Sequence, residues 1–116
     1  METQKSVADW AFKTFGKRDL NYRIRNFLEE AIELAEACGL RGPDIRNVVE
    51  GVLNRGQLSG FIREESADSL ATLYALCTQQ KFDVHKELDK KMKINRSRPQ
   101  SYYDEKTAKK FAQGIL

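Results

Sequence analysis

Apolar residues recur at helical spacing along most of this 116-residue chain, and this pattern constrains the fold more than any other feature. Few segments show the alternation that is typical of strands. The only two prolines, Pro43 and Pro99, stand where helical patterns are interrupted. A chain of this length allows one domain of ordinary size with one core. We therefore expect an all-α fold, a helical bundle of four to five helices.

Start and stop signals divide the chain into predicted helices. Ser6-Val7-Ala8-Asp9 resembles a capping box that starts the first helix. Gly39 is expected to stop a second helix that begins near Leu20. Asp44 and Asp83 are expected to cap two later helices. The later helices are predicted over 44–53, 62–79 and 84–97, with a loop over 58–60.

The end of the chain is expected to be less regular than the rest. Residues 102–116 are expected to form one or two weak amphipathic turns around Phe111, which are too short to be stable alone. We expect residues 1–100 to form the helical domain. The tail, 101–116, then packs on that domain or on a partner subunit.

Composition excludes several classes of protein. Hydrophobic residues are 41% and charged residues 32%, as in a soluble globular domain rather than a disordered chain. No apolar run reaches the roughly 18–20 residues of a membrane span, and the N-terminus has no signal-peptide pattern. Cys38 and Cys77 show no metal spacing and are expected to be buried free thiols. We therefore expect a cytoplasmic protein with no membrane partner.

Two pairs of carboxylates carry the strongest functional signal. Glu30 and Glu33 are three residues apart in one predicted helix, and Glu65 and Asp68 are three apart in another. Residues i and i+3 are neighbours on a helix surface. Four such carboxylates supply the hard oxygen ligands of a magnesium ion that holds a polyphosphate. Because they would repel one another without a cation, we expect Mg²⁺ as the cofactor, with Mn²⁺ as a possible substitute.

Helical wheels give the two pairs matching positions. Glu30 and Glu65 lie at the edge of the apolar arc of their helices, and Glu33 and Asp68 lie farther round on the same side. The pairs can therefore converge if the helices pack antiparallel. Glu29 and Glu64 fall away from the arcs and are expected to be solvated, the alternative being a supporting or water-activating role. The arcs, which we expect to be the core, contain Ile24, Phe27, Leu28, Ala31, Leu34, Ala35 and Cys38, and Ile62, Leu70, Leu73, Leu76 and Cys77.

A basic segment follows the second carboxylate pair. The chain has a net charge of +3, and its cations gather between residues 86 and 98. Lys91, Asn95 and Arg98 follow i, i+4, i+7 spacing, so they share a face if the helix reaches that far. Two helices with paired carboxylates are followed by a basic helix. This order favours an anionic ligand that is bound together with a divalent cation. The alternative for the basic segment is a solvated helix face.

These motifs resemble a known family. Glu29-Glu30-Ala31-Ile32-Glu33 and Glu65-Ser66-Ala67-Asp68 are similar to the EExxE…ExxD signature of the MazG-like all-alpha nucleoside triphosphate pyrophosphohydrolases. The similarity covers about residues 6–98, and the segment 34–64 is longer than is usual in the family. The resemblance implies a dimeric or tetrameric helical bundle that splits nucleoside triphosphates or deoxynucleoside triphosphates to the monophosphate and pyrophosphate.

The resemblance also implies roles for individual residues. It implies magnesium ligands at Glu30, Glu33, Glu65 and Asp68, with Glu30 or Glu33 acting on the attacking water. It implies phosphate contacts at Lys91, Asn95 and Arg98.

Recognition of the base or sugar is encoded more weakly. Trp10 could stack on a base, and Tyr22 and Asn26 lie on the same side of their helix as Glu30 and Glu33. Each has the alternative of an ordinary packing or surface residue.

Two other functions compete with the pyrophosphohydrolase. A ferritin-like di-iron bundle needs Glu-x-x-His, but the single histidine, His85, has Phe82 three residues before it. The remaining alternative is a non-catalytic helical protein that binds nucleotides, or nucleic acid through the basic 86–98 segment. No helix-turn-helix or aromatic-basic platform supports nucleic acid as a partner.

Overall fold

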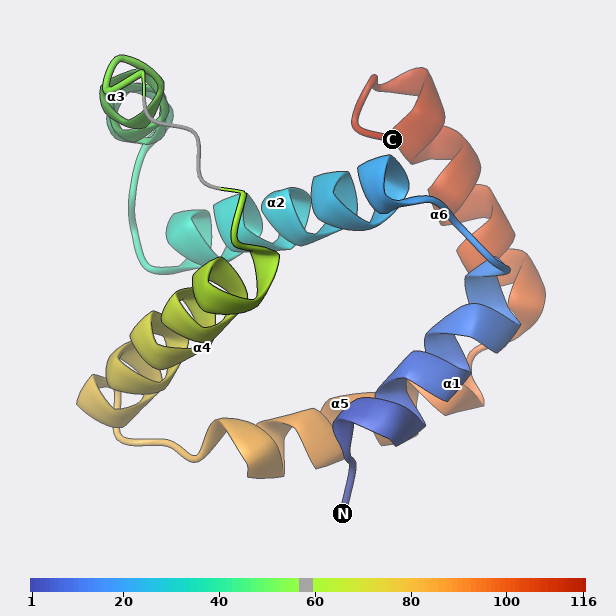
Figure 1. Cartoon of the computed structure of the whole chain (residues 1–116). Coiled ribbons are helices and arrows are strands. Elements are labelled where there is room, and N and C mark those ends of the chain that lie inside the picture. The colour runs from blue at the N-terminus through green and yellow to red at the C-terminus, as the bar shows by residue number, and fades with distance from the viewer. Residues whose placement is uncertain (57–59) are drawn as a thin grey trace. The chain divides into compact units, whose positions relative to one another are not determined.

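The computed structural model describes residues 1–56 and 60–116, and every regular element in those ranges is a helix (Figure 1). This confirms the all-α class. The predicted number of four to five helices was too low, because the described residues form six. The helices are α1 (Gln4–Phe15), α2 (Leu20–Ala37), α3 (Gly42–Leu53), α4 (Ile62–Gln79), α5 (Val84–Ser97) and α6 (Gln100–Ala112).

The sixth helix comes from the tail that was expected to be weak turns. α6 has 13 residues and begins directly after Pro99. The loop predicted over 58–60 lies outside the described residues except for Gly60. Among the described helices, none has the length and apolar character needed to cross a membrane.

The chain divides into two compact units. The α4–α5 unit comprises Met1–Trp10 and Leu58–Arg98, and the α2–α6 unit comprises Ala11–Gln57 and Pro99–Leu116. The two predicted carboxylate pairs therefore belong to different units. The division of the chain into 1–100 and 101–116 stays a prediction.

The start of α1 differs from the prediction by one turn. Thr3 Oγ1 accepts a hydrogen bond from the Ser6 backbone N–H at 3.1 Å, and Ser6 Oγ accepts one from the Thr3 N–H at 2.8 Å. These reciprocal bonds form a capping box in which serine replaces the usual glutamate. The predicted box at Ser6–Asp9 is therefore wrong, and Asp9 instead pairs with Lys5 at 2.6 Å on the helix surface.

The predicted cap of α3 is wrong. The helix begins at Gly42, with Pro43 near its start, so Asp44 is its third residue and accepts a hydrogen bond from the Arg41 N–H at 3.4 Å.

The predicted ends at Asp83 and Gly39 are confirmed. Asp83 caps α5 by accepting a hydrogen bond from the His85 N–H at 2.9 Å, as expected. Asp19 caps α2 in the same way, through the Tyr22 N–H at 2.9 Å. Gly39 stops α2 with a positive φ of 94°, which glycine adopts without strain.

Lys81 occupies a position after α4 that favours glycine. Its φ is 64°, and the Phe82 N–H closes the helix end on the Cys77 carbonyl at 3.1 Å. A side chain in the left-handed region costs about 1 kcal/mol relative to glycine. We expect Lys81→Gly to raise the free energy of unfolding by about that amount in urea titrations. Gln80→Gly is the control, because its φ of −84° gives glycine no advantage; an equal gain there would contradict the explanation.

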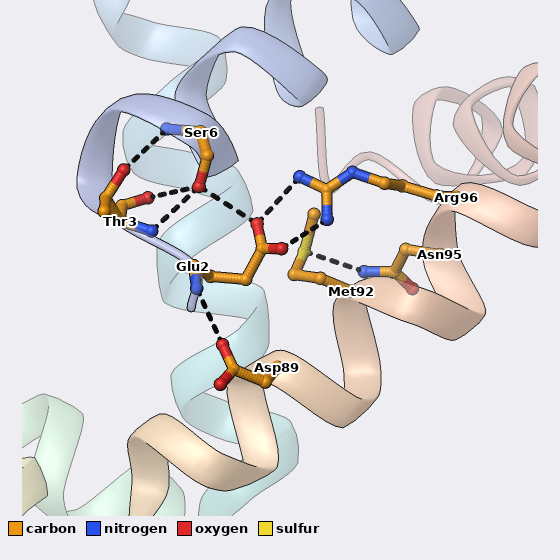
Figure 2. A network of polar contacts seen from close by, with 7 residues as sticks. All are labelled: Glu2, Thr3, Ser6, Asp89, Met92, Asn95 and Arg96. Carbon is orange, nitrogen blue, oxygen red and sulfur yellow. Dashed lines mark hydrogen bonds and ion pairs between the residues drawn. The ribbon is translucent and has the colours of Figure 1, made fainter.

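The N-terminus is attached to α5 inside the α4–α5 unit (Figure 2). The Arg96 guanidinium donates to both Glu2 carboxylate oxygens, at 2.5 and 2.7 Å, and the Glu2 N–H donates to Asp89 Oδ1 at 2.7 Å. The hydrogen bond from Arg96 lowers the pKa of Glu2. The contact therefore stabilises the fold above the ordinary carboxyl pKa, and this stabilisation is lost as pH falls through the lowered value. Cys77 and Met92 are the buried apolar residues among those described in this unit.

Aromatic contacts hold α6 in the α2–α6 unit. Tyr22 and Tyr103 are buried. The Phe15 and Tyr103 rings meet edge-on at 5.6 Å between centroids, and Tyr22 lies 6.2 Å from Phe111. These pairs fix α6 against the end of α1 and against α2, as its red ribbon shows (Figure 1). The tail thus forms a packed helix within the α2–α6 unit.

The predicted core arcs are largely exposed. Phe27 on α2 is 57% exposed and Ile62 on α4 is 64% exposed, and Cys38 is an exposed free thiol rather than a buried one. Cys77 is buried, as expected. The periodicity identified apolar helix faces, but it could not show what covers them. The large exposed apolar residues of α2 and the adjoining α3 are Leu20, Ile24, Phe27, Leu28, Leu34, Val48, Val49, Val52 and Leu53.

Candidate functional site

Both carboxylate pairs lie within helices, as predicted. Glu30 and Glu33 are exposed residues of α2, and Glu65 and Asp68 are exposed residues near the start of α4. The i, i+3 spacing therefore makes each pair surface neighbours. Since the pairs belong to different units, their convergence on one ion stays a prediction.

Each pair by itself offers two carboxylates, so water and phosphate oxygens would have to complete the coordination of a magnesium ion. Within either unit, the described residues contain no group of three or more His, Cys, Asp or Glu side chains arranged to hold a metal. Magnesium prefers octahedral oxygen coordination and usually combines one or two carboxylates with water and phosphate oxygens. The donors present are carboxylates alone, which fits magnesium or manganese better than a soft metal.

Glu33 is the carboxylate most affected by its surroundings. Although the side chain is exposed, partial desolvation by the surrounding protein raises the pKa of Glu33, and repulsion from Glu30 and Glu29 raises it further. Lys110 and Lys106 of α6 act in the opposite direction. Negative charge is therefore concentrated on this face of α2, and a cation placed there would relieve the repulsion.

The raised pKa of Glu33 predicts how stability depends on pH. The folded protein is more stable when the Glu33 carboxyl is protonated. This extra stability is fully present below the ordinary carboxyl pKa and is lost as pH rises through the raised pKa of Glu33. We expect Glu33→Gln to raise the urea midpoint at neutral pH without metal, and to leave it unchanged at low pH. Equal midpoints for the variant and the wild type at neutral pH would contradict this explanation.

Glu29 is not solvated, contrary to expectation. Its Oε1 lies 2.8 Å from Lys110 Nζ, and the two side chains are only 9% and 19% exposed. Asn26 Nδ2 approaches the same oxygen at 3.5 Å. No sequence pattern indicates this pair, because 81 positions separate its members and α6 was not expected. Glu64, by contrast, is exposed, as predicted.

A groove of about 580 Å³ runs beside Glu33 inside the α2–α6 unit. One wall is α2, and the other is the chain that follows α6. Arg25 Nη1 approaches the Gly114 and Ile115 carbonyls at 3.5 Å. Carboxylates and apolar side chains thus share one open surface. The groove is lined by Arg25, Leu28, Glu29, Ile32, Glu33, Glu36, Gly114 and Ile115.

The predicted phosphate contacts lie on or just after α5. Lys91 is exposed and Asn95 is half-buried, with Asn95 Nδ2 placed 3.5 Å from Met92 Sδ (Figure 2). Arg98 follows the last helical residue and has an extended backbone, with ψ of 141°. The regular i+7 geometry therefore does not extend to Arg98, and its phosphate role stays a prediction.

Two other cations of the basic segment already have acidic partners. Arg96 pairs with Glu2, and Lys90 Nζ lies 3.2 Å from Glu87. The positive charge available to a polyanion is correspondingly smaller than the sequence indicates.

The candidates for base or sugar recognition are divided between the units. Trp10 is half-buried at the end of the N-terminal part of the α4–α5 unit. Tyr22 is buried, with Phe111 near its ring and the Arg18 guanidinium 4.7 Å from its centroid. The structure gives Tyr22 a packing role. Asn26 is half-buried beside Glu29. Base or sugar contact by these residues stays a prediction.

Comparison with known proteins finds no family model, no curated protein and no solved structure that matches this chain. The MazG-like resemblance therefore rests on the residues themselves, the two carboxylate motifs and the basic element that follows them.

Proposed function

We propose that this protein is a magnesium-dependent pyrophosphohydrolase of the MazG-like type, which converts nucleoside triphosphates or deoxynucleoside triphosphates to the monophosphate and pyrophosphate. The two carboxylate pairs on exposed helix surfaces of α2 and α4 carry the proposal. Glu33 stands one turn from Glu30 on α2, and repulsion from Glu30 and Glu29 adds to the desolvation that raises its pKa. Mutual repulsion among these carboxylates favours the binding of a divalent cation and of the phosphates that the cation coordinates.

The chain's own residues have distinct roles in the proposed reaction. Glu30, Glu33, Glu65 and Asp68 hold magnesium, which supplies charge neutralisation and a lowered water pKa when bound. Glu30 or Glu33 orients or deprotonates the water that attacks the α-phosphorus. Lys91 and Arg98, with Asn95, bind the leaving pyrophosphate and balance its charge.

The proposal includes a cytoplasmic homodimer or homotetramer. Exposed apolar residues on α2 and α3, including Phe27 and Val52, support self-association. Contiguous apolar surface of this kind marks contact sites in soluble proteins. The symmetric closed oligomer is the commonest way in which identical chains cover such a surface.

The test is incubation of the purified protein with a panel of nucleoside and deoxynucleoside triphosphates, with and without Mg²⁺, followed by chromatography of the products. The expected products are the monophosphate and pyrophosphate, and both should disappear on chelation. Nucleoside diphosphate with inorganic phosphate would indicate a different reaction. Absence of turnover together with strong, salt-dependent DNA binding would favour the non-catalytic alternative based on residues 86–98.

A further inference from the structure

The Lys110–Glu29 pair joins two segments that nothing in the sequence connects. Its Nζ–Oε1 distance is 2.8 Å, and both side chains are largely shielded from solvent. Shielding weakens the competition from water and salt that makes most surface pairs ineffective. The pair is therefore a defined contact rather than a transient surface one.

The position of α6 makes this contact relevant to the first carboxylate pair. The Tyr22–Phe111 contact sets α6 against α2, and Lys110 precedes Phe111 in the chain. Lys106 lies one turn earlier than Lys110 on α6, and Glu29, the partner of Lys110, lies one turn before Glu33 on α2. The last turn of α6 thus brings positive charge to the acidic face of α2.

We propose that Lys110 is a positioning residue for the first carboxylate pair: its ammonium holds Glu29 toward α6 and offsets the negative charge that a divalent cation meets at Glu30 and Glu33. This inference rests on the proposed function. Glu29 directly precedes the pair in the chain. Its carboxylate cannot coordinate the metal unless its ion pair with the Lys110 ammonium is broken. Lys110 therefore limits both the number of carboxylates offered to the cation and the affinity for it.

The charged groups around Glu33 set the expected direction of change. Glu29 and Glu30 come from α2, with Arg25 and Glu36 lining the same groove, and Lys106 and Lys110 come from α6. Loss of Lys110 makes the set of charged residues around Glu33 more negative by one charge. A divalent cation at a separation of about 8 Å should then bind roughly fivefold more tightly at low ionic strength.

The variant Lys110→Met tests the inference with two readouts that need no catalysis. A double-mutant cycle of Lys110→Met with Glu29→Gln in urea should show that the two side chains stabilise each other, and electron paramagnetic resonance should show tighter Mn²⁺ binding by Lys110→Met, by roughly fivefold. Lys109→Met is the matched control, because it removes the same charge from the neighbouring exposed position of α6. Lys110→Arg keeps the charge and should restore the wild-type values.

The outcomes separate this inference from the proposed function. Equal gains in Mn²⁺ affinity in Lys110→Met and Lys109→Met, or equal gains in Lys110→Met and Lys110→Arg, would overturn the role of Lys110. If the urea cycle shows coupling between Lys110 and Glu29 but the wild type binds no Mn²⁺, Lys110 stays the counter-ion of Glu29 and the proposed metal site is overturned.

Discussion

Replacement of Glu33 by glutamine is expected to reduce kcat/KM for magnesium-dependent triphosphate hydrolysis by about 10²–10³-fold or more. Glutamine keeps the size of the side chain but removes the charge that would hold the metal. Because the repulsion among Glu29, Glu30 and Glu33 also disappears, the helical circular dichroism spectrum should be retained. The measurement is steady-state release of pyrophosphate by the variant and the wild type.

Glu36→Gln is the matched control for this experiment. Glu36 lies on α2 beside the same groove, but it is outside both carboxylate motifs. Its replacement removes one negative charge and should leave kcat/KM within a few fold of the wild type. Full activity in Glu33→Gln, or an equal loss in both variants, would exclude the assignment of Glu33 as a ligand.

Phe27→Gln is expected to break the oligomer. Phe27 is 57% exposed on α2, and Ile24 and Leu28 beside it are also exposed. Loss of a phenylalanine from a packed interface costs about 3–5 kcal/mol, which raises the dissociation constant by roughly 10²–10⁴-fold. Sedimentation velocity over a range of protein concentrations should show a dimer or tetramer for the wild type and a smaller species for the variant.

Lys13→Gln is the control for self-association, because Lys13 is an exposed polar residue of the same unit. It should assemble as the wild type does. A wild-type protein that sediments as a monomer at every concentration would contradict the proposed role of the apolar face.

The parts of the fold that sequence predicts well are those set by local chemistry. α2, α4 and α5 lie within a residue or two of their predicted ranges. Asp83 and Gly39 mark helix ends because a cap and a left-handed turn depend on only a few neighbouring residues. The placement of both carboxylate pairs on helices follows from the same local information.

The parts that were missed depend on contacts between distant segments. α6 is short and was expected to be weak, but Tyr103 and Phe111 pack it against residues that precede it by more than 80 positions. The Glu29–Lys110 pair depends on that packing, so no spacing rule could indicate it. The helical wheels identified the apolar faces of the helices correctly. Whether such a face is buried depends on the segment that covers it, and a helical wheel holds no information about that segment.

Paramagnetic broadening by Mn²⁺ tests most directly whether the two carboxylate pairs form one site. Amide resonances of the isotopically labelled protein are followed during titration with Mn²⁺, with Mg²⁺ as the competing diamagnetic ion. The account predicts that signals around Glu33 on α2 and around Asp68 on α4 broaden over the same Mn²⁺ range and recover together with Mg²⁺. Broadening at only one helix, or at the two helices over separate ranges, would contradict a shared metal site.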